Sequence, residues 1–486
     1  MACGCSVWLS RLPEAAFEEP FFGMVKLFGQ YVRSGTIALC LFEYSILAAV
    51  FFGMSGWYDP RALLSGEADL FVNFALLPSM VTWLALYSLG GYEPAAQDFL
   101  GALAHRLATA SLLGFAATIL LNEFALGMRY PLELLLAAYI FGYFLILGNR
   151  IVVKYGIDSN AFKPRALVLG AGRAAANLHH LSRIRTLRSV TLYGFAEING
   201  TDDVNPKLPP AKVFSEIDNL LDFAVAHSIS EIIVALDDRR GVLDVRDLLE
   251  CRLKGIRVTE AATFFEREAG KVDLNHIYPS WLIYSDGFQR SWLTDPLKRL
   301  FDIAVSAAVL IGTAPIWVLT ALAIKLDSPG PVFYRQVRVG FRGRPFSVLK
   351  FRSMRTDAEK AGPQFARAGD ARVTRVGALI RKTRIDELPQ TVNVLRGDMS
   401  FVGPRPERPN FVKEFEKLVP YYNDRHNVKP GITGWAQINY PYGDTLDDAR
   451  EKLTYDLYYI KNYTLFLDMV IILKTLNIVV WKVGSR

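Results

Sequence analysis

Two adjacent carboxylates, Asp386 and Glu387, follow three cationic side chains in the stretch 381–390. A carboxylate can act as a nucleophile or bind a metal ion, and cations beside it attract anionic substrates such as phosphates. The stretch also has the pattern of a helix start, with Asp386 as the cap, Pro389 in the first turn and Gly397 after the last turn. We therefore predict a helix beginning at Asp386. The side chain of Asp386 is interpreted either as a cap or as a reactive group, because a carboxylate bound to helix amides would be a poorer nucleophile.

Basic residues outnumber acidic ones about two to one between Lys325 and Lys429, and they fall into short blocks. A solvated basic face is the ordinary explanation for any one block. Arg405 differs, because it lies between Pro404 and Pro406, which confine its backbone to extended conformations. A guanidinium held in one place suits bidentate binding of a phosphate.

The composition points to a membrane-associated protein with an anionic partner. The chain has 486 residues, 51% of them hydrophobic and 21% charged, with a net charge of +7. Its length predicts two to four domains. No nucleic-acid-binding signature accompanies the positive charge, so we expect lipid headgroups or phosphorylated substrates as partners. The four cysteines lack metal-ligand spacing and are expected to be free thiols, and no signal peptide is recognised.

Four apolar runs in the first third have about the length needed to cross a bilayer: residues 37–54, 70–89, 108–128 and 133–153. The flank after the fourth run carries Arg150 and three further cations, whereas the loops after the first and third runs are not basic. By the positive-inside rule, both termini are expected on the cytoplasmic side. Glu43, inside the first run, is interpreted as a hydrogen-bond partner between helices, the alternative being a functional site.

The middle of the chain alternates short apolar runs with helical patterns, which predicts βαβ units around a parallel sheet. The first of these runs leads into Gly170, Gly172 and Ala175 in a G-x-G-x-x-A pattern. Such glycines can let the backbone approach a pyrophosphate, so these three residues are candidates for nucleotide binding. The alternative is a structural or regulatory Rossmann-like domain, because no Tyr-x-x-x-Lys pair for hydride transfer is present.

Three segments of the last third are expected at the membrane or at the substrate. Residues 297–326 are apolar, with Pro315 near their middle, and similar charges flank both ends. We predict a kinked segment that enters the membrane and returns on the same side, the alternative being a straight fifth span. The loop 429–439 carries Trp435 as an expected interfacial or base-stacking residue. Residues 465–483 are expected to lie along the interface, because charges interrupt their apolar pattern.

These elements, in this order, resemble the bacterial polyprenyl-phosphate hexose-1-phosphate transferases, the large monotopic phosphoglycosyl transferases. The resemblance covers essentially the whole chain and rests on Lys350-Phe-Arg-Ser-Met354, on Arg381 followed by Asp386-Glu-Leu-Pro-Gln390, and on two longer stretches, 393–406 and 429–437. It implies a multidomain membrane protein: a four-helix transmembrane bundle at 1–155, a Rossmann-like α/β cytoplasmic domain at 156–290, and a mainly helical monotopic catalytic domain at 291–486. The re-entrant helix at about 297–326 would be broken at Pro315.

The resemblance also implies the roles of individual residues. Asp386 would attack the β-phosphate of a UDP-sugar and release UMP, and undecaprenyl phosphate would take the sugar phosphate in a second, ping-pong step. Glu387 would be the second catalytic residue and would bind Mg²⁺, which prefers carboxylate and phosphate oxygens. The substrate phosphate would be bound by four cations: Lys350, Arg352, Arg381 and Arg405.

The chain departs from the family pattern after the Trp-Ala-Gln loop. Many members carry Asn-Gly-Arg there, whereas this chain has Asn439-Tyr440. Arg450 is one candidate to replace the missing arginine, and the sugar stays open. The resemblance further implies a homodimer in the bacterial inner (cytoplasmic) membrane, with the soluble domains on the cytoplasmic side.

We therefore expect an enzyme that initiates exopolysaccharide or O-antigen synthesis. One alternative is a membrane-anchored NAD(P)-dependent sugar-nucleotide epimerase or dehydratase that uses the Rossmann-like module. Another is a scaffold for a polysaccharide assembly complex, without enzymatic activity.

Overall fold

The structure is a computed structural model that describes residues 24–27, 30–58, 75–92, 100–121, 131–156, 163–184, 187, 190–198, 204–215, 217–237, 245–274, 292–358, 370–441, 443 and 445–481. The chain forms two compact units. One holds Met1–Leu27, Tyr31–Glu43 and Asn149–Ala269, and the other holds Phe28–Gln30, Tyr44–Gly148 and Gly270–Arg486. The domain boundaries predicted at residues 155 and 290 stay predictions, and the second of them lies outside the described residues.

Apolar helices make up the N-terminal part, after a two-stranded sheet of β1 (Met24–Leu27) and β2 (Gln30–Arg33). They are α1 (Ser34–Tyr58), α4 (Leu77–Ser88), α6 (Leu100–Leu121) and α7 (Leu132–Gly156). Among the described residues, α1, α6 and α7 each contain a segment long and apolar enough to cross a membrane. The predicted second span corresponds to α4, which has 12 residues, and residues 70–74 of that span lie outside the described part. A bundle of four spans therefore stays a prediction.

A buried ion pair joins α1 to α7. The Glu43 carboxylate accepts hydrogen bonds from Nε and Nη2 of Arg150 at 2.5 and 2.9 Å. The interpretation of Glu43 as a partner between helices is confirmed. Because Arg150 binds Glu43, it should not be counted among the cations that were used to predict a cytoplasmic position for both termini.

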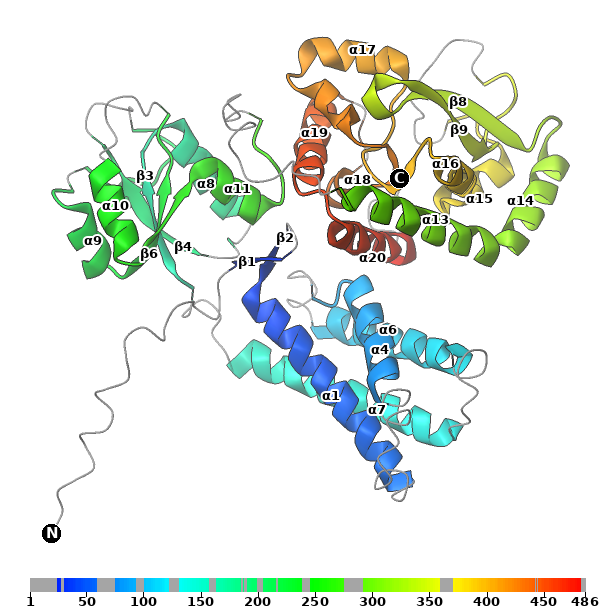
Figure 1. Ribbon diagram of the computed structural model, residues 1–486, viewed down its shortest axis with the longest axis horizontal. Coiled ribbons are helices and arrows are strands. Elements are labelled where there is room, and N and C mark those ends of the chain that lie inside the picture. Colours follow the sequence, from blue (N-terminus) through cyan, green and yellow to red (C-terminus); the bar gives the residue numbers. More distant parts are fainter. Residues whose placement is uncertain are drawn as a thin grey trace. The chain divides into compact units, whose positions relative to one another are not determined.

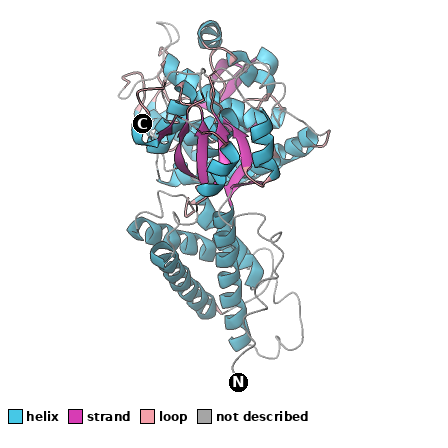
Figure 2. Cartoon of the chain, turned by 90° about the vertical axis from the view of Figure 1, so that its left-hand side faces the viewer, coloured by secondary structure: helices cyan, strands magenta, loops and turns pink. Residues whose placement is uncertain are grey.

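The α/β domain contains the predicted parallel sheet, with strand order β5-β4-β3-β6-β7. Its elements are β3 (Arg165–Leu169), α8 (Arg173–Ile184), β4 (Thr191–Ala196), η4 (Pro210–Lys212), β5 (Val213–Phe214), α9 (Leu220–Ala226), β6 (Ile229–Val234), α10 (Val245–Leu253), β7 (Arg257–Glu260) and α11 (Ala261–Ala269). Helices α8 and α11 pack on one face of the sheet, and α9 and α10 pack on the other (Figure 1). Figure 2 shows the strands of this sheet between helices. The strands read as apolar runs because both faces of the sheet are covered.

The C-terminal part is mainly helical, with two small sheets. Its elements are α13 (Thr294–Gly312), α14 (Ala314–Asp327), β8 (Phe333–Val339), η5 (Phe341–Gly343), β9 (Pro345–Phe351), α15 (Arg375–Lys382), η6 (Ile385–Glu387), α16 (Gln390–Arg396), β10 (Ser400–Val402), α17 (Pro409–Leu418), η7 (Tyr422–Asn427), β11 (Gly431–Thr433), α18 (Trp435–Asn439), α19 (Leu446–Lys461) and α20 (Leu465–Trp481). Strands β8 and β9 form an antiparallel hairpin, and β10 pairs with β11 in parallel.

The predicted kink in residues 297–326 is confirmed as a break between α13 and α14, which bend by 60°. The break is at Thr313, and Pro315 stands in the first turn of α14, where its missing N–H removes no hydrogen bond from that helix. The chain therefore avoids a proline inside a helix by starting a new one. Whether the pair returns to the same side of a membrane stays a prediction.

A polar cluster fixes α13 and α20 to the strand that leads into the site. Lys298 Nζ lies 2.6 Å from Asp468 Oδ2, and Tyr459 donates a hydrogen bond to Asp468 Oδ1 at 2.8 Å. Asp302 accepts hydrogen bonds from the Ser400 hydroxyl and the backbone amide of Phe401, at the start of β10. Asp468 had been interpreted as a charge that breaks an apolar pattern, and its contacts show that it is a buried ion-pair partner.

Candidate active site

The two adjacent carboxylates lie in a tight 3₁₀ turn rather than at the start of an α-helix. Helix α15 ends at Lys382, Arg384 adopts a left-handed backbone conformation (φ 58°), and η6 follows directly. Helix α16 begins only at Gln390, after Pro389, and no cap is formed by Asp386. The predicted capping role of Asp386 is therefore wrong. The predicted helix end is confirmed, because Gly397 has φ 96° directly after the last turn.

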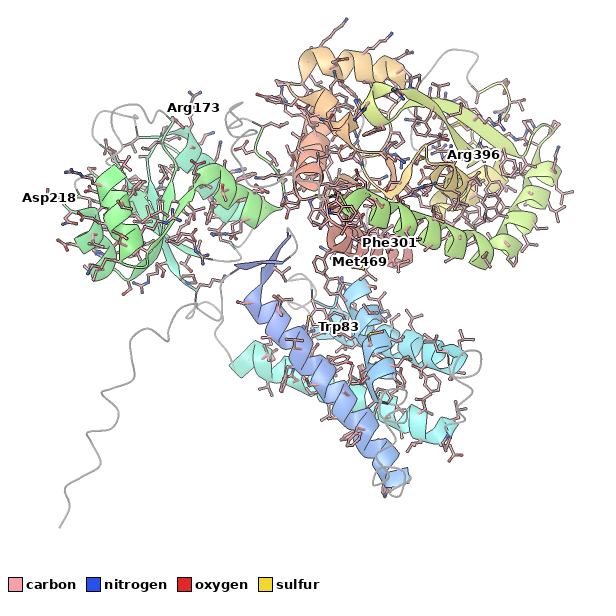
Figure 3. All side chains as sticks on the ribbon, in the orientation of Figure 1. Trp83, Arg173, Asp218, Phe301, Arg396 and Met469 are labelled. Atoms are coloured by element: carbon pink, nitrogen blue, oxygen red, sulfur yellow. The ribbon has the colours of Figure 1, made fainter. Side chains whose placement is uncertain are left out.

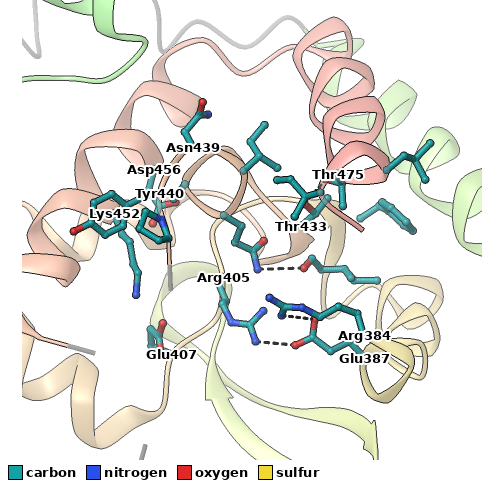
Figure 4. Close-up of a pocket in the computed structure, with 18 of the residues that line it drawn as sticks. Arg384, Glu387, Arg405, Glu407, Thr433, Asn439, Tyr440, Lys452, Asp456 and Thr475 are labelled. Carbon is teal, nitrogen blue, oxygen red and sulfur yellow. Dashed lines mark hydrogen bonds and ion pairs between the residues drawn. The ribbon is translucent and has the colours of Figure 1, made fainter. Parts of the chain in front are cut away.

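Glu387 is held by three cations, two of which, Arg384 and Arg405, are labelled in Figure 4. Its Oε1 accepts from Arg405 at 2.7 Å and from Lys350 at 3.1 Å, and its Oε2 accepts from Arg384 at 3.4 Å. Burial by itself would raise the pKa of Glu387, but Arg405, Lys350 and Arg384 hold that pKa well below its ordinary value. Glu387 is therefore ionised and fixed in position.

Asp386 is buried as well, with 8% of its surface exposed, but its carboxylate has no hydrogen bond or ion pair with any described residue. Burial and the charge of Glu387 raise its pKa to about 6, against the opposing effect of Lys350, Arg381 and Arg384. A carboxylate that is desolvated and unbonded keeps its lone pairs available for attack on an electrophile. Of the two carboxylates, Asp386 thus has the properties of a nucleophile.

Two cavities adjoin the pair of carboxylates. The first, which we call the cationic cavity, measures about 520 Å³ and contains Asp386, Lys350, Arg381 and Arg405 in its lining. The second, the apolar cavity, measures about 500 Å³ and contains Glu387 and Arg405. Four of its apolar lining residues come from distant parts of the chain: Val309, Leu388, Ile432 and Leu476. Arg405 lines both cavities, so one guanidinium stands between them.

The β10–β11 pair brings Arg405 to the carboxylates. Ser400 is in register with Gly431, and Val402 with Thr433, so the loop after β10 starts from a fixed point. A Cβ atom at Gly403 would lie 2.3 Å from the Lys429 carbonyl oxygen, which only glycine avoids. The two backbones can therefore approach closely enough to direct the Pro404-Arg405-Pro406 loop into the site.

The two cations of β9 and its end have different roles. Lys350 contacts Glu387, and burial lowers its pKa. Arg352 donates instead to the carbonyls of Ser328 and Pro329 at 2.7 and 2.6 Å, at the C-terminal end of α14. Its guanidinium binds the exposed carbonyls of a helix end, although it also lines the cationic cavity. The contacts of Arg352 therefore give no support to the prediction that it binds substrate phosphate.

The glycine-rich turn of the α/β domain has no open phosphate site. Gly170 has φ 116°, and a Cβ there would lie 2.5 Å from the Ala235 carbonyl oxygen, while Ala175 is buried in the core. The amides of Arg173 and Ala174, at the start of α8, donate to Asp237 at 2.7 and 2.9 Å. Figure 3 shows Arg173 at this helix start. Asp237 thus occupies the amides that would bind a pyrophosphate, and nucleotide binding by Gly170, Gly172 and Ala175 gains no support.

Trp435 is not the exposed stacking residue that the sequence suggested. Its ring is 8% exposed, stacks on Tyr458 at 5.6 Å between centroids, and donates from Nε1 to the Gly270 carbonyl at 2.7 Å. The Trp435 ring is therefore part of the core, and the expectation that this residue is an interfacial or base-stacking group was wrong.

The residues that depart from the family pattern line the apolar cavity. Asn439 and Tyr440 both contribute to its wall, and the Tyr440 hydroxyl donates to Asp448 at 2.9 Å. Arg450, the candidate substitute for the missing arginine, is exposed and lines neither cavity.

Sequence reasoning did not single out two arginines of the site. Arg384 contacts Glu387 three residues further along the chain, a spacing at which side chains on a helical turn can pair, so this contact could have been predicted. Arg425 is buried and donates to the Arg405 carbonyl at 3.0 Å, and no local pattern indicated that contact.

Comparisons with known proteins agree on one class. The model of the bacterial sugar transferase family matches residues 293–482. The chain is 44% identical over 254 residues to a UDP-N-acetylgalactosamine-undecaprenyl-phosphate N-acetylgalactosaminephosphotransferase of Aeromonas hydrophila, a match that covers 51% of this chain and 58% of that protein. It is 28% identical over 424 residues to the UDP-glucose:undecaprenyl-phosphate glucose-1-phosphate transferase of Escherichia coli, covering 85% and 89% of the two chains.

A third relative is matched over nearly its whole length. The exopolysaccharide production protein PSS of Rhizobium leguminosarum is 45% identical over 185 residues, which is 92% of that protein and 37% of this chain.

Proposed function

This chain belongs to the bacterial sugar transferases, and from that premise we propose that it transfers a hexose 1-phosphate from a UDP-sugar to undecaprenyl phosphate. The products would be undecaprenyl-diphosphate-sugar and UMP, and the reaction would initiate exopolysaccharide or O-antigen synthesis. The observation that carries this proposal is the contrast between the two carboxylates. Asp386 is buried beside a cationic cavity and has no bond to a described residue, while Glu387 is fixed by Arg405, Lys350 and Arg384.

The reaction would proceed in two displacements. An oxygen of Asp386 attacks the β-phosphorus of the UDP-sugar, the bond from that phosphorus to the bridging oxygen breaks, and UMP leaves with the electron pair. The sugar phosphate is then an acyl phosphate on Asp386. An oxygen of undecaprenyl phosphate attacks the same phosphorus, the bond to Asp386 breaks, and the carboxylate is regenerated. Arg381 and Lys350, which already lower the pKa of Asp386, would reduce the repulsion between a carboxylate and a phosphate.

The residues at the site fit Mg²⁺, which takes one or two carboxylates together with phosphate oxygens. Glu387 would hold the ion through the carboxylate that also accepts hydrogen bonds from Arg405, Lys350 and Arg384. When bound, Mg²⁺ would neutralise charge on the transferred phosphate. Without a substrate, the described residues include no group of three metal-ligating side chains, so the substrate's own oxygens would complete the coordination.

The membrane setting is also proposed. The apolar helices α1, α6 and α7, the bent pair α13–α14 and the apolar cavity support a protein of the bacterial inner membrane that takes its lipid substrate from the bilayer. A UDP-sugar is supplied in the cytoplasm, so we place the soluble parts and both termini on that side. A homodimer remains an expectation from the resemblance.

The test is the release of UMP by purified protein in lipid nanodiscs containing undecaprenyl phosphate and Mg²⁺, with a panel of UDP-hexoses and UDP-N-acetylhexosamines. We expect UMP and a lipid-linked sugar from at least one donor, and no UMP from Asp386→Asn. The matched control is Asp218→Asn, which removes an exposed carboxylate of the α/β domain and should leave the rate unchanged. UMP release by Asp386→Asn close to the wild-type rate would falsify the proposal.

The two-step mechanism has its own test. Without undecaprenyl phosphate, the enzyme should release one UMP per active site in a burst, and the peptide containing Asp386 should carry a sugar phosphate by mass spectrometry. If UMP appears only after the lipid is added, a direct transfer replaces the covalent intermediate while the overall activity stands.

A further inference from the structure

The loop that carries Arg405 is held by its carbonyl groups. The carbonyl oxygens of four successive residues, 404–407, each accept a hydrogen bond. The Pro404 and Glu407 carbonyls accept from the backbone amides of Gly431 and Val339. The Arg405 and Pro406 carbonyls accept from the guanidinium groups of Arg425 and Arg338. The distances lie between 2.9 and 3.0 Å. Two of these four residues are prolines, which have no N–H, so the loop cannot stabilise itself by regular backbone pairing. Two guanidinium groups therefore donate the hydrogen bonds that the amides of a neighbouring strand would otherwise supply.

Arg425 is itself fixed from behind. Its Nη2 lies 2.8 Å from Asp456 Oδ2 of α19, and its Nη1 donates to the Tyr422 hydroxyl at 2.6 Å. The side chains of Arg425 and Asp456 are 6% and 2% exposed. A buried guanidinium with a carboxylate on one side and a hydroxyl on another has little freedom, because any movement would leave a buried charge unpaired. The Arg405 carbonyl is thus tied to α19 through a rigid connection.

The position of the Arg405 backbone decides what its side chain reaches. The Arg405 guanidinium is 2.7 Å from Glu387 Oε1 and lines both the cationic and the apolar cavity. Its side chain is 25% exposed, so it has room to swing if the backbone is released. A shift of about 1 Å at a catalytic cation can lower a rate substantially, because electrostatic stabilisation depends on placement before the reaction.

We propose that Arg425, anchored by Asp456, is a positioning residue that holds the Arg405 backbone so that its guanidinium meets Glu387 and the transferred phosphate. This role rests on the proposed function and deepens it. Arg338 also holds the loop, and it lines the cationic cavity together with Asp386, whereas Arg425 lines the apolar cavity, whose lining does not include Asp386. Arg425 acts on Arg405 from the side of α19.

The experiment is a double-mutant cycle on UMP release with Arg425→Lys, Arg405→Lys and the double variant. Lysine keeps the charge of Arg425 but cannot contact Asp456, Tyr422 and the carbonyl at once. We expect Arg425→Lys to lower kcat about 10- to 100-fold in the wild-type background, as for other residues that orient catalytic groups. In the Arg405→Lys background it should cost less than about twofold, because the group it positions has gone. An equal loss in both backgrounds overturns the proposal.

The matched control is Arg267→Lys in the α/β domain. Arg267 is equally buried and donates to both oxygens of Glu231 at 2.9 Å, so its replacement disturbs a similar ion pair in the compact unit that does not hold Asp386. Its kcat should stay within about twofold of wild type. If the melting curve shows that Arg425→Lys does not fold, Asp456→Asn takes its place in the cycle. It should then lower kcat in the wild-type background and have little effect in the Arg405→Lys background.

A second measurement separates this proposal from the proposed function. Hydrogen exchange of the peptide containing Arg405 and Glu407 should accelerate in Arg425→Lys and stay unchanged in Arg267→Lys. If the wild-type protein releases no UMP from any donor, the proposed function fails and exchange alone decides the positioning role. Unchanged exchange in Arg425→Lys overturns the positioning role whatever the activity.

Discussion

Asp237 of the α/β domain and Asp386 of the C-terminal part each stand next to the start of a helix, but their surroundings differ in one respect. The Asp237 carboxylate accepts hydrogen bonds from two amides at the start of α8. Asp386 lies in a 3₁₀ turn, four residues before the first residue of α16, and among the described residues nothing is bonded to its carboxylate.

This difference shows how one residue type serves two purposes. A carboxylate that accepts from helix amides stabilises the helix and has its lone pairs engaged. A carboxylate that is buried without such donors is destabilised as a charge, which raises its pKa and leaves it reactive. In this chain the amides that follow the glycine-rich motif are bonded to Asp237, and the residue that looked like a cap is the one we propose as the nucleophile.

The largest expected effect is on the rate of UMP release, which should depend on Asp386 and not on Asp237. Asp386→Ala should lower the rate of UMP release by at least about 10³-fold, because the nucleophile is lost. Asp237→Ala should change it less than about twofold, since Asp237 accepts from the amides at the start of α8 and belongs to the compact unit that does not hold Asp386. Both rates are measured on the same nanodisc preparation. Comparable losses in the two variants would remove the contrast.

Replacing the cation on the side of Asp386 should likewise lower the rate of UMP release more than replacing the cation beside Asp237. Arg405→Lys should lower the rate about 10- to 100-fold, because lysine cannot reproduce the fork that meets Glu387. Arg173→Lys, at the exposed cation 3.9 Å from Asp237, should have no measurable effect. Steady-state kinetics of UMP release give both values. A rate for Arg405→Lys equal to wild type would show that any cation suffices there.

The pH dependence should report Asp386. Because its pKa is raised to about 6, Asp386 is protonated at a pH where an ordinary aspartate is already ionised. Attack requires the ionised form, so the single-turnover rate should fall about tenfold per pH unit below pH 6 and level off above it. The profile of Asp237→Ala should coincide with that of wild type. A rate that is flat from pH 5 to pH 8 contradicts this assignment.

The smallest expected effect is on hydrogen exchange, where replacing Asp237 should matter and replacing Asp386 should not. Asp237→Ala removes the acceptor for two amides of α8 and should lower the free energy for local opening of that helix by about 1 kcal/mol. The amides of α8 should then exchange about fivefold faster with solvent. Asp386→Ala should leave exchange in α16 unchanged, because Asp386 caps nothing. Faster exchange of α16 in that variant would restore the capping role.

Features set by neighbouring residues were predicted well from the sequence. The apolar runs of α1, α6 and α7, the alternation of strands and helices in the α/β domain, and the end of α16 at Gly397 depend on local periodicity and backbone preferences. The cationic surroundings of Asp386 and Glu387 were also expected, because the blocks of basic residues are visible in the chain.

Features set by distant contacts were not. Trp435 is fixed by a carbonyl 165 residues away, and Arg352 by carbonyls of a helix end 23 and 24 residues before it. The left-handed conformation of Arg384, which places Asp386 in a 3₁₀ turn, has no sequence signal, since glycine or asparagine is the usual residue for such a position. The connection from Asp456 through Arg425 to Arg405 likewise exists only in the folded chain.

The Glu43–Arg150 pair has a consequence for how the protein is made. Its members are 107 residues apart, so α1 leaves the ribosome long before α7. A single charge in the hydrocarbon core costs about 2.5–3.5 kcal/mol on insertion scales, and α1 carries that cost until its partner arrives. Chains that end before Arg150 would lack the cation that binds the Glu43 carboxylate inside an otherwise apolar segment. For an α1 that crosses a bilayer, the arrival of α7 would therefore be the step that neutralises this charge.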